Sequence, residues 1–300
     1  GGERRRTEIA RCLAIDPKFK KLAALTLAGA MSLSLAACGP KGSASTSGSS
    51  AGTSGSSASG SQAAASDVDY VKEKGTLVVG MTDFAPMDYK AEGSDEWIGF
   101  DADMAKAFAE SLGVEVEFLE INWDNKALEL ENKGVDAVWN GMTLTDDVKA
   151  LMATSEPYCL NGQVVVLAAD VADQYQTVES LSGLSFAVEN GSAGMEQAEA
   201  AGLDYVAMDT QAKALMEVAS GTSDAAIIDL LMAGAMIGEG TSYPDLTYTV
   251  QLNSEEYGVG FRKGSDLAEA FNNFWKEAYD AGTVMETAKT YGVQESVIEK

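Results

Sequence analysis

The sequence predicts an α/β protein made of two lobes, and three observations lead to that prediction. Strand-like and helix-like segments alternate from residue 67 to residue 300. A stretch of that length is large for one hydrophobic core and comfortable for two. A helix, a glycine stop and an Asp-Ala pair that opens a strand occur twice, ending at Asp136-Ala137 and at Asp224-Ala225. Alternation of this kind indicates mainly parallel sheets covered by helices.

The first half opens with the apolar run 76–81, which predicts a buried strand. Apolar residues spaced four apart over 100–112 then predict one face of an amphipathic helix, and the glycine that follows ends it. Alternating apolar and acidic residues over 114–118 predict a half-exposed strand. The run 135–139 predicts another strand of the same lobe.

The second half repeats this logic. We expect a strand over 185–188, helices over 192–201 and 210–220, and a buried strand over 225–228. Apolar residues at helical spacing within 268–278 predict a final helix that packs on a core.

The segment before residue 67 has the layout of an export signal followed by a tether. Three lysines at positions 18–21 precede an apolar run over 22–35, and small residues then lead to Cys38. The run would span about 21 Å as a helix, at ~1.5 Å per residue, which is short of the ~30 Å hydrocarbon core of a bilayer. We therefore expect residues 1–37 to be a signal and upstream segment that is removed, rather than a transmembrane helix.

The stretch that ends at Cys38 resembles a bacterial lipobox, whose cysteine is acylated and becomes the new N-terminus; the alternative is an incidental thiol. Residues 38–66 are almost entirely Gly, Ser, Ala and Thr, which predicts a flexible linker. The expected location is therefore extracytoplasmic, with the protein lipid-anchored to the cell membrane.

Charge and composition exclude several function classes. The chain has 46 acidic residues against 21 Lys and Arg, a formal net charge of −25. Nucleic acid and anionic lipid both require basic clusters, so neither is an expected direct partner. The absence of histidine excludes Ser-His-Asp triads and His-ligated zinc. Because no Cys-x-x-Cys pair and no complete dinucleotide fingerprint occurs, we expect neither a metal nor a cofactor.

Cysteine usage gives no disulfide framework. With residues 1–37 removed and Cys38 acylated, Cys159 has no intramolecular partner. We expect Cys159 to be a small buried apolar residue.

Short motifs follow one another in order between Gly75 and Gly292. They occupy residues 75–80, 84–87, 98–101, 123–124, 135–143, 145, 157–158, 162–166, 191–192, 224–229 and 257–264. In this order and spacing they resemble the extracellular solute-binding proteins of polar amino-acid ABC importers, the group that includes glutamine- and histidine-binding proteins.

The resemblance implies a two-lobed, type II periplasmic-binding-protein-like fold of the α/β class, with a ligand cleft between lobes that close by hinge motion. Lobe one would hold residues 67–161 and 255–300, and lobe two residues 162–254. Two hinge strands, at 162–167 and 257–261, would join the lobes.

The resemblance also implies a function. The chain would be the substrate-binding lipoprotein of an ABC importer, a monomer that captures an amino acid or a similar small polar amine and docks on permease subunits. It would perform no chemistry. One alternative is a cleft enzyme of the same fold, similar to dehydratases of aromatic precursors, for which Glu189 is the one candidate acid. Another alternative is an extracellular sensor that reports to a signalling partner.

The cleft must meet both charges of a zwitterion, and several residues are candidates. Asp229 ends an apolar strand, where ligands of α/β sheets bind, and by resemblance it accepts the ligand ammonium; the alternative is a helix N-cap. Gly191, Ser192 and Ala193 open a helix whose free N–H groups favour an anion, with a plain Ser192 cap as the alternative.

By resemblance, Asn140, Gly141, Met142 and Thr143 contribute backbone and hydroxyl contacts to the ligand. Phe84 corresponds to an aromatic residue that covers the ligand, and core packing is its alternative.

For Trp123 and Trp139 two positions are possible, in the wall of the cleft or in the core. Asp83 and Glu189 are either surface acids or, if they face the cleft, groups that favour a cationic ligand side chain.

One position departs from the family pattern. Where the family usually carries an arginine that clamps the α-carboxylate, this sequence has Val148. Lys149 is adjacent, but on a helix the next residue points about 100° away. Three explanations stay open: backbone N–H groups and Thr143 hold the carboxylate, another cation reaches in, or the ligand has no α-carboxylate.

Overall fold

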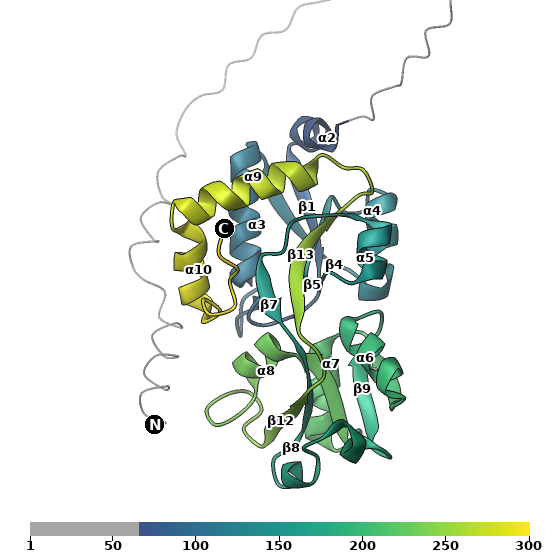
Figure 1. The fold of residues 1–300 in the computed structure, drawn as a ribbon. Coiled ribbons are helices and arrows are strands. Elements are labelled where there is room, and N and C mark those ends of the chain that lie inside the picture. Colours follow the sequence, from purple (N-terminus) through teal and green to yellow (C-terminus); the bar gives the residue numbers. More distant parts are fainter. Residues whose placement is uncertain (1–65) are drawn as a thin grey trace, which may run out of the picture.

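Two mixed β-sheets, one in each of two lobes, organise residues 66–300, which are the residues that the computed structural model describes (Figure 1). The expectations for the export signal, for Cys38 and for the linker up to residue 65 lie outside the described residues.

The first sheet has the strand order β4-β1-β5-β13-β6, and β7 also pairs with β13. Its strands are β1 (Thr76–Met81), β4 (Glu115–Glu120), β5 (Ala137–Thr143), β6 (Ala153–Thr154), β7 (Cys159–Asn161) and β13 (Glu255–Phe261). A two-stranded ribbon of β2 (Tyr89–Lys90) and β3 (Trp97–Ile98) lies apart from it. Cys159 is fully buried in β7, as expected.

Helices cover both faces of this sheet, with α3, α9 and α10 on one side and α4 and α5 on the other (Figure 1). The helices of the lobe are α2 (Asp67–Lys74), α3 (Phe100–Leu112), α4 (Lys126–Glu131), α5 (Asp146–Leu151), α9 (Leu267–Asp280) and α10 (Thr283–Tyr291), with a 3-10 turn at Trp123–Asn125. The core between α9 and the sheet is aromatic. Trp139 packs edge-on against Phe271, with ring centroids 4.9 Å apart, so Trp139 is a core residue.

The second sheet has the strand order β10-β9-β11-β8-β12. Its strands are β8 (Gln163–Ala168), β9 (Ser185–Glu189), β10 (Asp204–Met208), β11 (Ala225–Asp229) and β12 (Leu246–Gln251). Its helices are α6 (Ala193–Ala201), α7 (Gln211–Ser220) and α8 (Leu230–Met236), with 3-10 turns at Ala172–Gln174 and Val178–Leu181. Asp229 and Glu189 end neighbouring parallel strands, so both side chains lie at the sheet edge that faces lobe one.

The chain passes between the sheets twice, from β7 to β8 and from β12 to β13. Gly162 makes the first passage. A Cβ at this position would lie 2.7 Å from Asn253 O of the second passage, so the close approach of the two segments requires glycine.

The expectation of mainly parallel sheets is wrong for β8 and β13, the strands that follow the two passages and are here called the crossing strands. β1, β4 and β5 are parallel, and so are β9, β10 and β11, but β8 and β13 pair antiparallel with their neighbours. The reason is connectivity, because a strand that enters a sheet from the other lobe does not arrive through a helical crossover.

The strand expected at 135–139 starts two residues later and continues to Thr143. Gly141 sits inside it with φ of 55°, and β13 shows a matching register shift between Gly258 and Gly260. A bulge of this kind continues the pairing past a glycine that looks like a strand end in the sequence.

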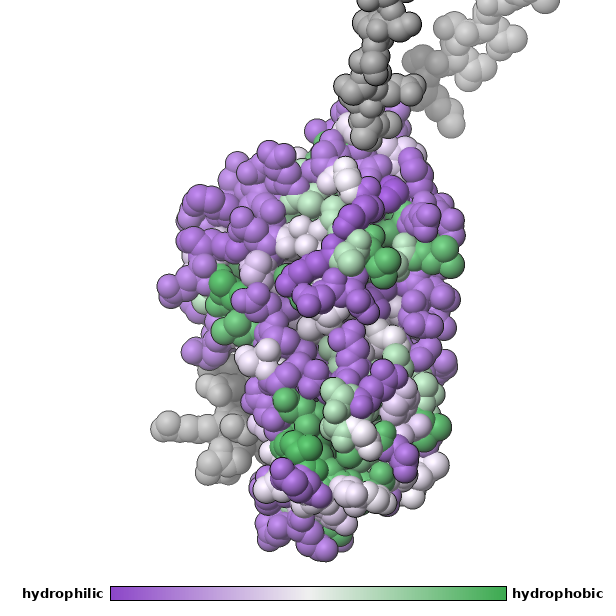
Figure 2. Space-filling model, turned by 45° about the vertical axis from the view of Figure 1, so that its right-hand side comes forward, coloured by the Kyte–Doolittle hydropathy of each residue, from purple (hydrophilic) through white to green (hydrophobic). Residues whose placement is uncertain are grey.

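Hydrophilic residues cover most of the face shown in Figure 2, with apolar residues in separate patches. Within residues 66–300, no helix combines the length and the apolar character needed to cross a bilayer.

Candidate functional site

A cavity of about 310 Å³ lies between the two lobes and is lined by residues of both. Ten of the residues expected in the cleft line it: Phe84, Trp123, Asn140, Gly141, Met142, Thr143, Glu189, Ser192, Ala193 and Asp229. Asp83 does not line it and is exposed.

Asp229 ends β11 and forms part of the cavity wall. It occupies the N-cap position of α8, but its side chain makes no capping hydrogen bond. Its Oδ1 accepts from Tyr257 Oη at 2.6 Å, from Gln163 Nε2 at 3.0 Å and from Asn161 Nδ2, and its Oδ2 accepts from Gln211 Nε2. Four neutral donors therefore hold this carboxylate in place.

A second carboxylate shares those donors. Asn161 Nδ2 and Gln163 Nε2 also donate to Glu255 Oε1, at 2.7 and 2.8 Å. Burial and the charge of Glu255 raise the pKa of Asp229 to about 7, although the hydrogen bonds from Tyr257 and others favour the ionised form.

Glu189 ends β9 beside Asp229 and is 3% exposed. Thr82 Oγ1, from lobe one, donates to its Oε1 at the long distance of 3.4 Å. Burial and then the charge of Asp229 raise the pKa of Glu189 to about 8, while the Lys126 ammonium acts in the opposite direction. Glu189 is thus a buried acid in the cavity wall, with hydrogen bonds from Thr82 and Gln211.

Asn140 lines the cavity, but its side chain is committed to the protein. Its Nδ2 donates to Thr82 O at 3.0 Å and to Asp88 Oδ2 at 2.8 Å, and its Oδ1 accepts from the Thr82 N–H at 3.0 Å. This amide holds the segment that carries Phe84 against β5. Phe84 in turn packs edge-on against Tyr257, with centroids 6.4 Å apart.

Two buried acids, Asp101 and Asp88, lie behind the cavity wall, and Asp101 holds the backbone of Gly141. Asp101 Oδ2 accepts from the Gly141 N–H and from Tyr158 Oη, both at 2.7 Å. Burial raises the pKa of Asp101 to about 7. Burial and the charge of Asp101 together raise the pKa of Asp88 well above its usual value.

The start of α6 forms part of the opposite wall. Ser192 caps the helix, because its side chain accepts from the Met195 N–H at 3.2 Å. Lys126 Nζ, from lobe one, donates to Gly191 O at 2.8 Å, so a hydrogen bond joins the lobes here. Burial lowers the pKa of Lys126, and the charges of Glu189 and other acids oppose that shift.

Val148 lines the cavity and is 7% exposed, at the place where a clamping arginine was expected. It lies in the first turn of α5, where its N–H donates to the Thr145 side chain at 3.2 Å. Lys149 is exposed and lies outside the cavity lining, so it does not substitute for an arginine.

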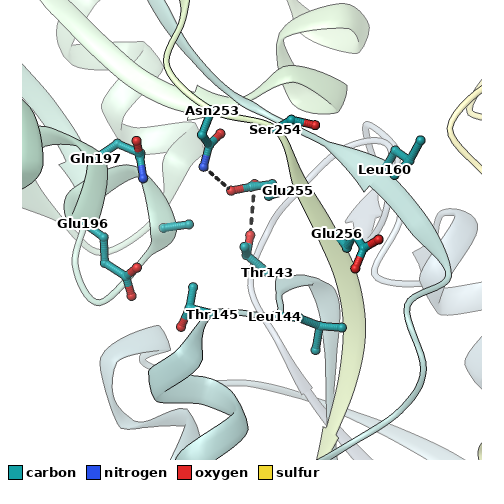
Figure 3. Close-up of a pocket in the computed structure, with 11 residues that line it drawn as sticks. Thr143, Leu144, Thr145, Leu160, Glu196, Gln197, Asn253, Ser254, Glu255 and Glu256 are labelled. Atoms are coloured by element: carbon teal, nitrogen blue, oxygen red, sulfur yellow. Dashed lines mark hydrogen bonds between the residues drawn. The ribbon is translucent and has the colours of Figure 1, made fainter.

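A second cavity, of about 420 Å³, adjoins the first and shares four residues with it: Thr143, Thr145, Ala193 and Glu196. Figure 3 shows Glu255 at its hinge side, where Oε1 accepts from Thr143 Oγ1 at 3.0 Å and Oε2 accepts from Asn253 Nδ2 at 2.9 Å. The hydroxyl of Thr143 is thereby directed to the hinge.

Several site residues were not among those expected. Gln163, Gln211, Lys126 and Glu196 all line the first cavity, and Tyr257 contacts Asp229. Gln211 carried one usable signal, since it opens a helix after a strand and therefore lies at the sheet edge that bears Asp229. The described residues hold no cluster of acids or cysteine suited to a metal ion.

Comparison with known proteins agrees with this geometry. The model of the bacterial extracellular solute-binding proteins, family 3, matches residues 77–294. The arginine-binding extracellular protein ArtP of Bacillus subtilis (strain 168) is 30% identical over 283 residues, which cover 91% of this chain and 98% of that protein.

Two solved structures are similar in fold and sequence. A mutant of ArgBP from T. maritima has a TM-score of 0.70 and 33% identity, over 75% of this chain and 98% of its own. The ancestral amino acid-binding protein AncCDT-1, a precursor of cyclohexadienyl dehydratase, has a TM-score of 0.69 and 30% identity, over 75% and 99%. The chain therefore belongs to the bacterial extracellular solute-binding proteins, family 3.

Proposed function

We propose that this chain is the substrate-binding subunit of an ABC importer and that it captures a small polar amine or amino acid in the cavity between its lobes. The observation that carries the proposal is the cavity wall, to which both lobes contribute polar side chains, with Glu189 and Asp229 from one lobe and Asn140 and Thr145 from the other. The relatives support it, since ArtP is an arginine-binding protein and ArgBP has an arginine-bound form.

In this proposal residues 67–161 with 255–300 and residues 162–254 move as two bodies about the crossing strands. Hinge closure buries the ligand, and the closed form docks on the permease. The protein acts as a monomer, and Cys38 carries a lipid anchor that keeps it at the outer face of the cell membrane.

A thermal-shift screen tests the binding function. Ligand that binds only the folded state stabilises it by about 2.7 kcal/mol at a hundredfold excess over the dissociation constant. We expect at least one member of a panel of polar amino acids and amines to raise the melting temperature of the purified protein. A panel without any shift contradicts the proposed function.

The enzyme alternative has one observation in its favour, since a buried Glu189 with a pKa of about 8 is protonated at neutral pH and could act as a general acid. The other ionisable residues that line the cavity are Lys126 and five further acids. We expect no turnover of a cyclohexadienyl substrate; measurable dehydration that Glu189→Gln abolishes would replace the binding proposal with the enzyme.

A further inference from the structure

The charges that line the interlobe cavity are strongly unbalanced. One basic side chain, that of Lys126, accompanies six acidic ones: Asp124, Asp147, Glu189, Glu196, Glu199 and Asp229. No arginine lines the cavity, so its described lining offers no guanidinium to a ligand carboxylate. A field of this sign attracts a cation and repels an anion.

Lys126 is not free to balance that field. Its Nζ donates to Gly191 O at 2.8 Å and to Trp123 O at 3.3 Å, and it lies 5.0 Å from the centre of the Trp123 ring. The charged groups that act on it are all carboxylates, namely Glu189, Asp124 and Glu196. Its ammonium is therefore already engaged by two backbone carbonyls and surrounded by acids.

The cavity wall at the ends of β9 and β11, here called the deep end, is rich in hydrogen-bond acceptors. Glu189 and Asp229 lie at adjacent strand ends and interact electrostatically. Gln163 lines the same cavity, is 1% exposed, and its Oε1 has no hydrogen-bond partner among the described residues. Its Nε2 donates to the Asp229 and Glu255 carboxylates, and a protonated amine or a guanidinium would provide the donor that its Oε1 lacks.

A second acidic centre lies where the two cavities join. Glu196 is shared by both cavities, and Figure 3 shows its carboxylate on the side of Thr145. It lies close enough to Asp147 and Glu255 for their charges to act on it. Apolar side chains that include Met142, Val148 and Met195 also line the first cavity.

The N-terminus of α6 is the remaining group that could hold an anion. Glu196 lies in its first turn and already offsets the helix dipole, and Ser192 already caps the Met195 N–H. These two groups therefore offset part of the attraction that the helix end would exert on a carboxylate.

We propose that the cleft takes a carboxylate-free organic dication, an alkyl chain with an amino or guanidino group at each end. One end lies against Glu189, Asp229 and Gln163, and the other against Glu196 and Asp147. This inference rests on the proposed function, because it names the class of ligand that the binding cavity accepts.

Matched pairs of compounds test the inference, since each pair differs only in the α-carboxylate: agmatine and arginine, cadaverine and lysine, putrescine and ornithine. The full chain is titrated calorimetrically with all six at physiological ionic strength. We expect the amine of the preferred pair to bind about tenfold or more tightly than its amino acid, because a carboxylate in this field lacks a partner.

A variant adds the missing cation. Val148→Arg is expected to weaken the preferred amine by about tenfold and to move the preference toward its amino acid. Val206→Arg is the matched control, since Val206 is 51% exposed on β10 and lines neither cavity. The control is expected to bind like the wild type.

The titration of the wild type alone decides whether the cleft prefers a carboxylate-free dication. Tighter binding of an amine supports the inference. Equal or tighter binding of the amino acid in every pair overturns it and leaves the proposed function intact. Failure of all six compounds also overturns it, and the thermal-shift panel then decides separately whether the cavity binds any polar ligand.

Discussion

Gln211 and Asp229 hold each other through two hydrogen bonds of opposite direction. The backbone N–H of Asp229 donates to Gln211 Oε1 at 2.9 Å, while Gln211 Nε2 donates to Asp229 Oδ2. One amide thus fixes both the end of β11 and the carboxylate that lines the cavity. Because both residues are buried, the loss of one leaves the other without its main partner.

Gln211→Leu should therefore destabilise the fold. It leaves a buried carboxylate oxygen and a backbone N–H without their partner, and hydrogen bonds to charged groups contribute about 1.5–3 kcal/mol. Urea unfolding should show a loss of that order in the free energy of unfolding. Gln174→Leu, at an exposed position, should change it by less than about 0.5 kcal/mol; a similar loss in both variants contradicts the assigned role.

Asp229→Asn should weaken the best ligand of the panel about tenfold or more, because removal of one partner of a buried charge pair costs about 2–5 kcal/mol of binding. Asp224→Asn is the control, since Asp224 lies just before the same strand and is exposed. Calorimetric titration compares the two variants. An unchanged dissociation constant for Asp229→Asn removes that residue from the site.

Binding of a cation should release protons at pH 7. Glu189 has a pKa of about 8 without ligand, so it is mostly protonated there, and a nearby positive charge favours its ionised form. Affinity should rise with pH up to about 8 and then level off. Titrations at pH 7 in buffers of different ionisation enthalpy measure the released protons, and Glu189→Gln should reduce that number. Proton uptake on binding contradicts this assignment.

The ligand-free protein should lose stability as pH rises from about 4 through about 7. The pKa of Asp101 is raised from 3.8 to about 7, so the folded state binds more protons than the unfolded state in that window. Asp88→Asn removes a second buried acid whose pKa is raised, and should reduce the difference in unfolding free energy between pH 5 and pH 8. Asp95→Asn, at an exposed acid of the same lobe, should leave the difference unchanged.

Cys38 should be the site of lipid attachment. When the chain is expressed with its N-terminal segment, the native protein should partition into detergent, whereas Cys38→Ala should remain in the aqueous phase. Fractionation of the cells measures this directly. Equal retention of both proteins in the membrane contradicts the anchor.

Much of the fold could be predicted because its signals are local. The spacing of apolar residues that ends at Leu112 predicted α3 to the residue, and Gly113 ends it in the left-handed conformation. The position of Asp229 at a strand end predicted its place in the cavity, because the ends of parallel strands meet at one edge.

Two kinds of feature could not be predicted: the side of a buried strand to which a side chain points, and contacts between residues far apart in the sequence. β5 is buried on both sides, so alternation could not show that Trp139 faces the aromatic core. Trp123 lies in a 3-10 turn, for which periodicity carries no signal, and it lines the cavity. The donors to Asp229 include Asn161, 68 positions away, which no local pattern brings to it.

The two amides that flank Gly162 have a mechanical consequence. Asn161 and Gln163 bind both Asp229 and Glu255, so the deep end of the cavity is attached to the crossing strands themselves. When two lobes rotate about a hinge, residues near the hinge move least and residues far from it move most. In the proposed closure Asp229 would keep one geometry, and one end of the ligand could bind there before the lobes close. The larger movement would fall where Glu196 of one lobe faces Asp147 of the other, and a bound cation would make the approach of these two acids favourable.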